Sequence, residues 1–267
     1  MFELPFMRLA LVVSMATGLS LGIMGVYLVI RRVIFFGLVL ANVATLGAAV
    51  AQAMGWPPEI ISFTAAVTAA AALGEVDASK RLSAESIMGW AYAAASSATV
   101  LVLSWAATGN SDTLHLLFGN VLAVQSNHAR GLAVLAAVVV LAQLSLMRRF
   151  LLVTFDPESA RIAGVNTRLW SLALNLSIGG VASAAVHEIG ALSTFALLAL
   201  PSTAALLATA SVRMTFLVAA ALGVVVPSLA LVLSFRFDLP AGPACVALLA
   251  LSVPLAGVVG ASARKAG

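Results

Sequence analysis

Residues 8–54 read RLALVVSMATGLSLGIMGVYLVIRRVIFFGLVLANVATLGAAVAQAM, two long apolar runs separated only by Arg31-Arg32. Each run reaches the roughly 20 residues that an α-helix needs to cross a bilayer. Backbone polar groups cannot remain unpaired in lipid, so each run is predicted to be a transmembrane helix. The first run lacks a small-residue cleavage pattern and ends at a pair of arginines. We therefore expect it to be a retained span rather than a signal peptide.

The whole chain has the composition of a membrane protein. Of its 267 residues, 62% are hydrophobic and 9% are charged, and its mean hydropathy is +1.11. Soluble domains carry about 25% charged residues, so a soluble fold is excluded. The net charge of +4 does not indicate nucleic-acid binding, because the basic residues lie at the ends of apolar runs, where a membrane protein places them.

The apolar runs predict an all-α, polytopic membrane protein that forms a single domain over residues 1–267. We expect spans at 8–30, 33–54, 59–75, 86–107, 131–147, 169–186, 190–209, 215–234 and 243–262. The apolar segment from Leu114 to Val124 is too short to span and is predicted to be a re-entrant or interfacial helix. Because this region is ambiguous, the predicted number of transmembrane helices is eight or nine.

The positive charges are distributed unevenly between the gaps. Eleven of the 14 Lys and Arg residues fall in alternate gaps, and only Arg8, Arg130 and Arg236 fall in the others. Cytoplasmic loops carry an excess of Lys and Arg. The distribution predicts a multi-pass protein of the cell membrane with its N-terminus outside and its C-terminus in the cytoplasm.

The longest cytoplasmic gap, residues 148–168, reads RRFLLVTFDPESARIAGVNTR and carries the signature of a short helix. Five positions make up this signature: Asp156, Pro157, Glu158, Ala160 and Gly164. An acid at the N-cap, proline at the first helical position and a second acid in the first turn favour a helix start. The alanine permits close approach and the glycine can end the helix. We predict either a coupling helix that docks on a cytoplasmic partner or a plain surface loop.

His187 and Glu188 adjoin each other at the outer end of a predicted span, and Glu59 falls on the same predicted side. An ionisable residue in or near lipid suggests a function. Adjacent helical residues point about 100° apart, so both can line one path only if the helix breaks, which Gly190 permits. The alternative is a solvated cap. A metalloprotease helix is excluded because Ala191 stands where its second histidine is needed.

Five segments, taken in order along the chain, resemble the zinc and manganese family of ABC permeases. They are RRVIFFGLVLAN at 31–42, LFGNVLAV at 117–124, DPESA at 156–160 with Gly164, the glycine-to-proline helix at 190–205, and DLPAGP at 238–243. The resemblance implies the membrane subunit of a type II importer, not itself an enzyme. Two copies would form a homodimer in membrane lipid, with an ABC ATPase below and an extracytoplasmic solute-binding protein above.

The resemblance also implies the cargo, which would be zinc, manganese or iron, free or chelated. ATP would be used by the partner, and no cofactor is expected on this chain, which lacks the G-x-x-x-x-G-K-[ST] loop of an ATPase. The lone Cys245 excludes a disulfide framework or a cysteine-built metal site within one chain.

One departure from the family concerns the translocation path. The family usually has Asp at the position of Leu38 and His at that of Asn42, four residues apart on one helix face. Here leucine cannot ligate and the asparagine offers only a neutral carbonyl oxygen. The resemblance places Leu38 and Asn42 on the path, together with His187 and Glu188 as candidates from the residues themselves, but no metal-ligand set is predicted.

Other functional classes fit the chain less well. A secondary transporter driven by an ion gradient is the alternative, but it needs ionisable residues near the bilayer midplane. The predicted spans hold almost none, because the acids and histidines lie at their ends. An intramembrane enzyme would need a histidine or acid to activate one of the many serines at the same depth. A membrane scaffold would not need the coupling-like segment.

Overall fold

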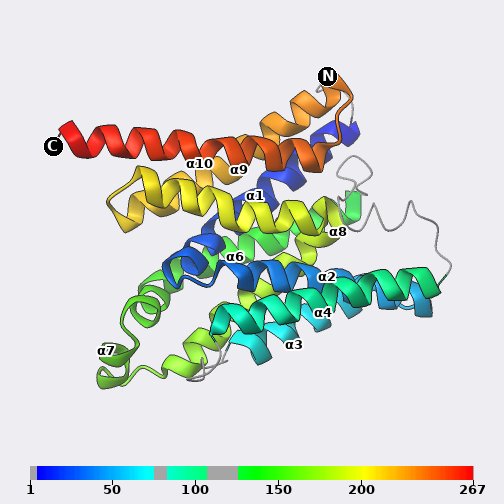
Figure 1. Ribbon diagram of the computed structural model, residues 1–267, viewed down its shortest axis with the longest axis horizontal. Coiled ribbons are helices and arrows are strands. Elements are labelled where there is room, and N and C mark those ends of the chain that lie inside the picture. The colour runs from blue at the N-terminus through cyan, green and yellow to red at the C-terminus, as the bar shows by residue number, and fades with distance from the viewer. Residues whose placement is uncertain (1–4, 75–82, 107–125, 267) are drawn as a thin grey trace.

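The computed structural model describes residues 5–74, 83–106 and 126–266, and every secondary-structure element in them is a helix. The helices are α1 (Pro5–Ile30), α2 (Ile34–Met54), α3 (Pro58–Gly74), α4 (Ala84–Trp105), α6 (Ser126–Phe155), α7 (Pro157–Ile162), α8 (Thr167–Ala208), α9 (Val212–Phe237) and α10 (Ala241–Ala266). The prediction of an all-α polytopic protein is confirmed. In Figure 1 most of the long helices run roughly side by side across the view.

Seven of the described helices are long and apolar enough to cross a membrane, with α8 counted once, and α3 is shorter at 17 residues. The 42 residues of α8 are not one straight rod, because Gly190 has φ 79° and ψ 164°. That conformation is almost restricted to glycine. It separates a first limb, residues 167–189, from a second limb, residues 191–208.

The contacts of the two limbs show that the chain reverses at Gly190. Asn175 lies at the end of α3, where its amide donates to the carbonyl of Gly74, and Ser183 lies near the start of α3. The first limb therefore runs antiparallel to α3. The second limb starts near Ser14 and Thr17, where Ser193 lines the same small pocket, and reaches Gly25 at Leu198. It therefore runs beside α1 in the same direction. Counting the limbs separately and adding α3 gives nine long helical segments in the described residues, which matches the upper of the two predicted numbers of spans.

Small residues let α1 pack directly against the backbones of α8 and α9. A Cβ built on Gly18 would lie 1.7 Å from the carbonyl oxygen of Gly223, and one on Gly22 would lie 2.7 Å from that of Ala219. The Ser202 hydroxyl donates to the carbonyl of Gly22 at 3.0 Å. Membrane helices associate through such close packing, because lipid provides no hydrophobic drive between them.

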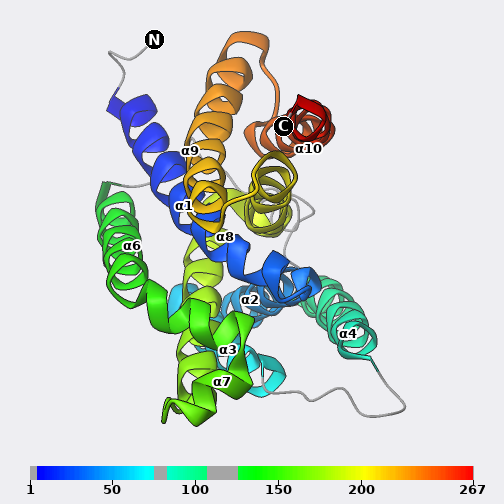
Figure 2. The same cartoon turned by 90° about the vertical axis from the view of Figure 1, so that its left-hand side faces the viewer.

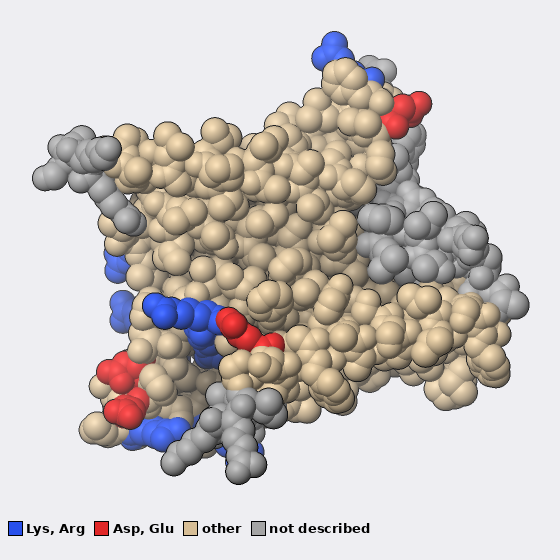
Figure 3. Space-filling view, in the orientation of Figure 1, with Lys and Arg blue, Asp and Glu red and all other residues tan. Residues whose placement is uncertain are grey.

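Charged side chains mark the two ends of the helical bundle. We call the end that holds Arg31, Arg149, Arg161 and Arg213 the basic end, and it also carries α7. In the orientation of Figure 3 most of the visible Lys and Arg side chains gather at one edge, and the middle of the molecule is uncharged. Figure 2 looks onto the basic end and shows α7 beside α6, with α4 and α10 at the periphery. This separation is what a polytopic membrane protein requires.

Two predicted borders differ from the structure. The span expected at 131–147 belongs to α6, which begins at Ser126 and continues through Arg148 and Arg149 to Phe155. Long cationic side chains can extend to the interface from within a helix, so they need not end it. The predicted re-entrant segment from Leu114 to Val124 lies outside the described residues.

Candidate functional site

The short helix predicted in the basic gap is present as α7. Asp156 has the non-helical φ and ψ of −144° and 81°, and its carboxylate accepts the backbone N–H of Ser159 at 2.9 Å. Pro157 follows at the start of the helix and Glu158 lies in its first turn. The N-terminus is therefore capped as the sequence predicts.

The end of α7 is fixed by Gly164, whose φ of 76° lies in the left-handed region. The N–H of Gly164 donates to the carbonyl of Arg161, and the N–H of Val165 donates to that of Ala160. These bonds satisfy carbonyls that a helix end leaves open. Ala160 is fully buried. The helix thus rests on the rest of the protein through its alanine, and the secondary structure predicted here is confirmed.

The two helices that flank α7, α6 and α8, contact each other next to it. The Arg149 guanidinium lies 4.9 Å from the centroid of the Trp170 ring, and Phe150 makes an edge contact with the same ring at 5.6 Å. Beside them, Nε of Arg161 donates to the hydroxyl of Thr167 at 3.3 Å. The end of α6 and the start of α8 are therefore joined, and α7 is held at both of its ends.

Ile162 is the functional candidate that sequence reasoning missed. Its side chain is 89% exposed on α7, outside the apolar body of the molecule. It lies two residues after the buried Ala160, which places it on nearly the opposite face of the helix. That offset was the signal available in the sequence. An exposed apolar side chain on a capped helix is suited to bind in an apolar groove of a partner protein.

Asp156 has an acid-sensitive capping role. A side-chain hydrogen bond with Ser159, and then the backbone N–H of that residue, hold the pKa of the Asp156 carboxyl below its ordinary value of 3.8. A lowered pKa means that the cap stabilises α7 above pH 3.8 and that this contribution is lost as the pH falls through the folded-state value. We expect Ser159→Ala to move the pKa of Asp156 upward, measured by NMR titration of its carboxyl carbon. An unchanged pKa would show that the Ser159 hydroxyl does not bond to the carboxylate, because the backbone N–H that makes the cap is kept in this variant.

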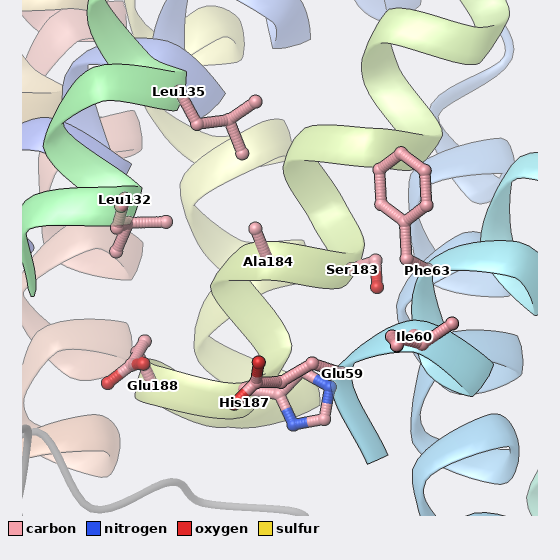
Figure 4. Close-up of a pocket in the computed structure, with 10 residues that line it drawn as sticks. Glu59, Ile60, Phe63, Leu132, Leu135, Ser183, Ala184, His187 and Glu188 are labelled. Carbon is pink, nitrogen blue, oxygen red and sulfur yellow. The ribbon is translucent and has the colours of Figure 1, made fainter. Parts of the chain in front are cut away.

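A cavity of about 440 Å³ lies between α3, α6 and α8. Figure 4 shows Glu59, His187 and Glu188 at one end of it, with Leu135 and Phe63 toward the other. Its remaining lining residues are Ile60, Gly131, Leu132, Ser183 and Ala184. The cavity is mainly apolar and carries its ionisable groups at the end away from α7.

Two local features bring these ionisable groups together. Glu59 lies in the first turn of α3, after the turn at Gly55. His187 and Glu188 end the first limb of α8 just before the break at Gly190, whose carbonyl accepts the hydroxyl of Thr194 at 2.8 Å. The break that the sequence permits is present. The sequence placed Glu59 on the same side as His187 but gave no sign that the two share a cavity, because they lie 128 positions apart in the chain.

Leu38 and Asn42 do not line this cavity. Both lie on α2, where Asn42 is 7% exposed and its amide donates to the carbonyl of Leu38 at 2.9 Å. The amide is thus bonded to its own helix. Within residues 5–74, 83–106 and 126–266, no three His, Cys, Asp or Glu side chains converge as a metal site. The path assignment of these two residues stays a prediction.

Comparison with known proteins gives a consistent family. The sequence matches the ABC 3 transport family over residues 3–259. It is 27% identical over 246 residues to the manganese transport system membrane protein MntC of Listeria innocua, covering 92% of this chain and 88% of that protein. It is 26% identical over 250 residues to the chelated iron transport system membrane protein YfeD of Yersinia pestis, covering 94% and 84%.

The fold also agrees with a solved structure. PsaBC from Streptococcus pneumoniae, solved in complex with a Fab, superimposes with a TM-score of 0.84 at 20% sequence identity. The superposition covers 95% of this chain and 91% of that one. At this identity the likeness establishes the fold.

Proposed function

Because the chain belongs to the ABC 3 transport family, we propose that it is the membrane permease of an ATP-driven importer for a transition metal ion or a metal chelate. The cargo class is supported by relatives named for manganese and for chelated iron. The chain would form a homodimer and receive its cargo from a solute-binding protein. ATP would be hydrolysed on a separate ATPase, with the basic end and the C-terminus in the cytoplasm.

The observation that carries this proposal is the construction of α7. An isolated helix of 6 residues is not stable in water. Here it is capped at both ends and joined to α6 and α8 at its base. It presents the exposed Ile162 at the basic end. These features suit a rigid docking helix for an ATPase, and a lipid-embedded scaffold would have no use for them.

The cavity beside Glu59, His187 and Glu188 is the proposed outer part of the cargo route. Carboxylates and imidazole attract and transiently bind divalent metals. The groups lie at the end away from the proposed ATPase side, where a solute-binding protein would release cargo. The gradient-driven alternative is less well supported. The buried polar side chains of the described residues are Ser, Thr, Asn and Gln, with no acid, lysine or histidine among them.

Reconstitution tests the proposal directly. Proteoliposomes that contain the permease, its ATPase and its solute-binding protein should accumulate manganese(II) when ATP is supplied. Vesicles that contain the permease alone should not accumulate it under a proton or sodium gradient. Accumulation by the permease alone would support a secondary transporter and overturn the proposal.

The cavity makes a separate prediction. Glu59→Gln, His187→Ala and Glu188→Gln should each lower manganese(II) uptake by about tenfold, the lower end of the loss caused by removing a polar group beside a bound metal. The measurement is the initial uptake rate in the complete vesicles. Glu85→Gln is the matched control, because Glu85 is an exposed acid in the first turn of α4, outside the cavity. Full uptake by all three cavity variants would remove this cavity from the route.

A further inference from the structure

Arg31 does more than mark the cytoplasmic side. It is half-buried at the end of α1, whereas its neighbour Arg32 is exposed. Its Nε donates to the hydroxyl of Thr154 at 3.2 Å, and its Nη1 donates to the side-chain carbonyl of Asn175 at 3.4 Å. One guanidinium therefore joins the end of α1 to the end of α6 and to the first limb of α8. Arginine can do this because its donors form a fixed planar fork.

The backbone at the end of α1 holds Arg31 in this inward position. Arg32 has a φ of 59°, a left-handed conformation that is unusual for a residue with a side chain. The N–H of Arg32 donates to the carbonyl of Val29, and that of Val33 donates to Leu28. This pair of hydrogen bonds is a common way to end a helix, and it usually has glycine at the left-handed position. The strained turn is thus locked by its own hydrogen bonds.

Asn175 extends the connection to α3. It is 3% exposed, and its amide nitrogen donates to the carbonyl of Gly74 at 3.2 Å. A Cβ on Gly74 would collide with that nitrogen, so a larger residue would push the Asn175 amide out of this position. Thr154, Arg31, Asn175 and Gly74 form a continuous chain of hydrogen bonds, which we call the basic-end latch.

The latch connects α7 to the cavity. Thr154 lies two residues before Asp156, the cap of α7. From the latch, α3 and the first limb of α8 both extend to the far end of the molecule, with opposite chain directions. There they carry Glu59, His187 and Glu188. The hydroxyls of Ser62 and Ser183 lie 3.0 Å apart near that end. Both helices are rods of about 25 to 35 Å, so a shift at one end appears at the other.

We propose that Arg31 and Asn175 are positioning residues that transmit ATPase movement at α7 to the cavity. The inference rests on the proposed function. Movement of α7 shifts Thr154, and the guanidinium passes this shift to α8 and, through Asn175, to α3. The shift reaches all three walls of the cavity, because α6 carries Thr154 and the latch connects it to α8 and α3. Coupling of this kind requires a physical element that both sites bias, and the latch supplies it.

The test uses the complete vesicles described above, with manganese(II) as cargo. Arg31→Gln, Thr154→Val and Asn175→Leu should each leave ATPase binding and basal ATP hydrolysis within about twofold of the original. They should lower the stimulation of hydrolysis by the loaded binding protein, and the manganese imported per ATP, by about tenfold, a usual size for coupling between sites. Arg31→Lys should rescue only in part, because an ammonium lacks the planar fork.

Matched controls separate coupling from folding. Arg32→Gln removes the same charge from the exposed neighbour, and Thr68→Val removes an exposed hydroxyl bonded only within its own helix. Both should leave coupling and melting temperature unchanged. Thr154→Val is nearly isosteric, so it reports on the latch even if Arg31→Gln unfolds.

Each outcome of the test is decisive. Normal stimulation and normal stoichiometry in Thr154→Val and Asn175→Leu would overturn the inference while leaving the importer intact. Absence of ATP-driven uptake in the original protein would instead be a failure of the proposed function.

Discussion

Gly18→Leu is expected to prevent α1 from packing against α9. Even a Cβ at this position would lie 1.7 Å from the backbone oxygen of Gly223, and backbone cannot rotate away as a side chain can. Overpacked cores lose about 1–3 kcal/mol, and a clash between two backbones belongs at or above the top of that range. We expect a loss of about 3 kcal/mol or more, measured as lowered expression and melting temperature of the purified permease. Gly18→Ala should show a smaller loss in the same direction.

The control for Gly18→Ala is the same substitution at glycines that have free space around them. Gly89 in α4 and Gly257 in α10 have nothing within 4 Å of a built Cβ. Alanine stabilises a helix interior relative to glycine by roughly 0.5–1 kcal/mol, so Gly89→Ala and Gly257→Ala should be neutral or stabilising. If Gly18→Ala were as stable as these two, α1 and α9 would not approach each other as closely as described.

Ile162→Asp is expected to abolish productive ATPase binding. The side chain is 89% exposed, so the change should not disturb the permease, but it would place a charge in the partner's apolar groove. Loss of a central interface anchor costs about 2–4 kcal/mol, which weakens binding on the order of 100-fold. The measurement is ATPase affinity for the purified permease in nanodiscs, together with ATP-driven uptake.

Two variants control for charge and for size. Ser211→Asp adds the same charge at an exposed position before α9, also at the basic end, and should bind normally. Ile162→Val keeps an apolar side chain and should bind within a few-fold of the original. Unchanged affinity in Ile162→Asp would show that α7 is not the docking helix.

The sequence was sufficient for features that depend on local chemistry. The spans follow from uninterrupted apolar runs, and α7 follows from the acid, proline and glycine at its ends. The break at Gly190 was allowed by residue type, although the reversal of α8 depends on packing against α1 and α3, which a linear pattern does not encode.

The site depended more on contacts between distant segments. Nothing near Glu59 indicates that it shares a cavity with His187, because the two meet only when α3 and α8 pack together. Asn42 looks like a candidate for the path, yet its amide is bonded to the carbonyl four residues earlier. Arg31 is a topology signal in the sequence, and its inward hydrogen bonds depend on Thr154 and Asn175, more than 100 residues away.

The contacts of Arg149 and Phe150 with Trp170 have a mechanical consequence. They join the end of α6 to the start of α8, the two helices on either side of α7, so a pull on α7 reaches both helices together. If α7 were joined to only one of these helices, the pull would reach that helix alone. In the proposed importer, movement of the ATPase away from the membrane can therefore pull the membrane helices back. The same docking helix would then serve both directions of movement.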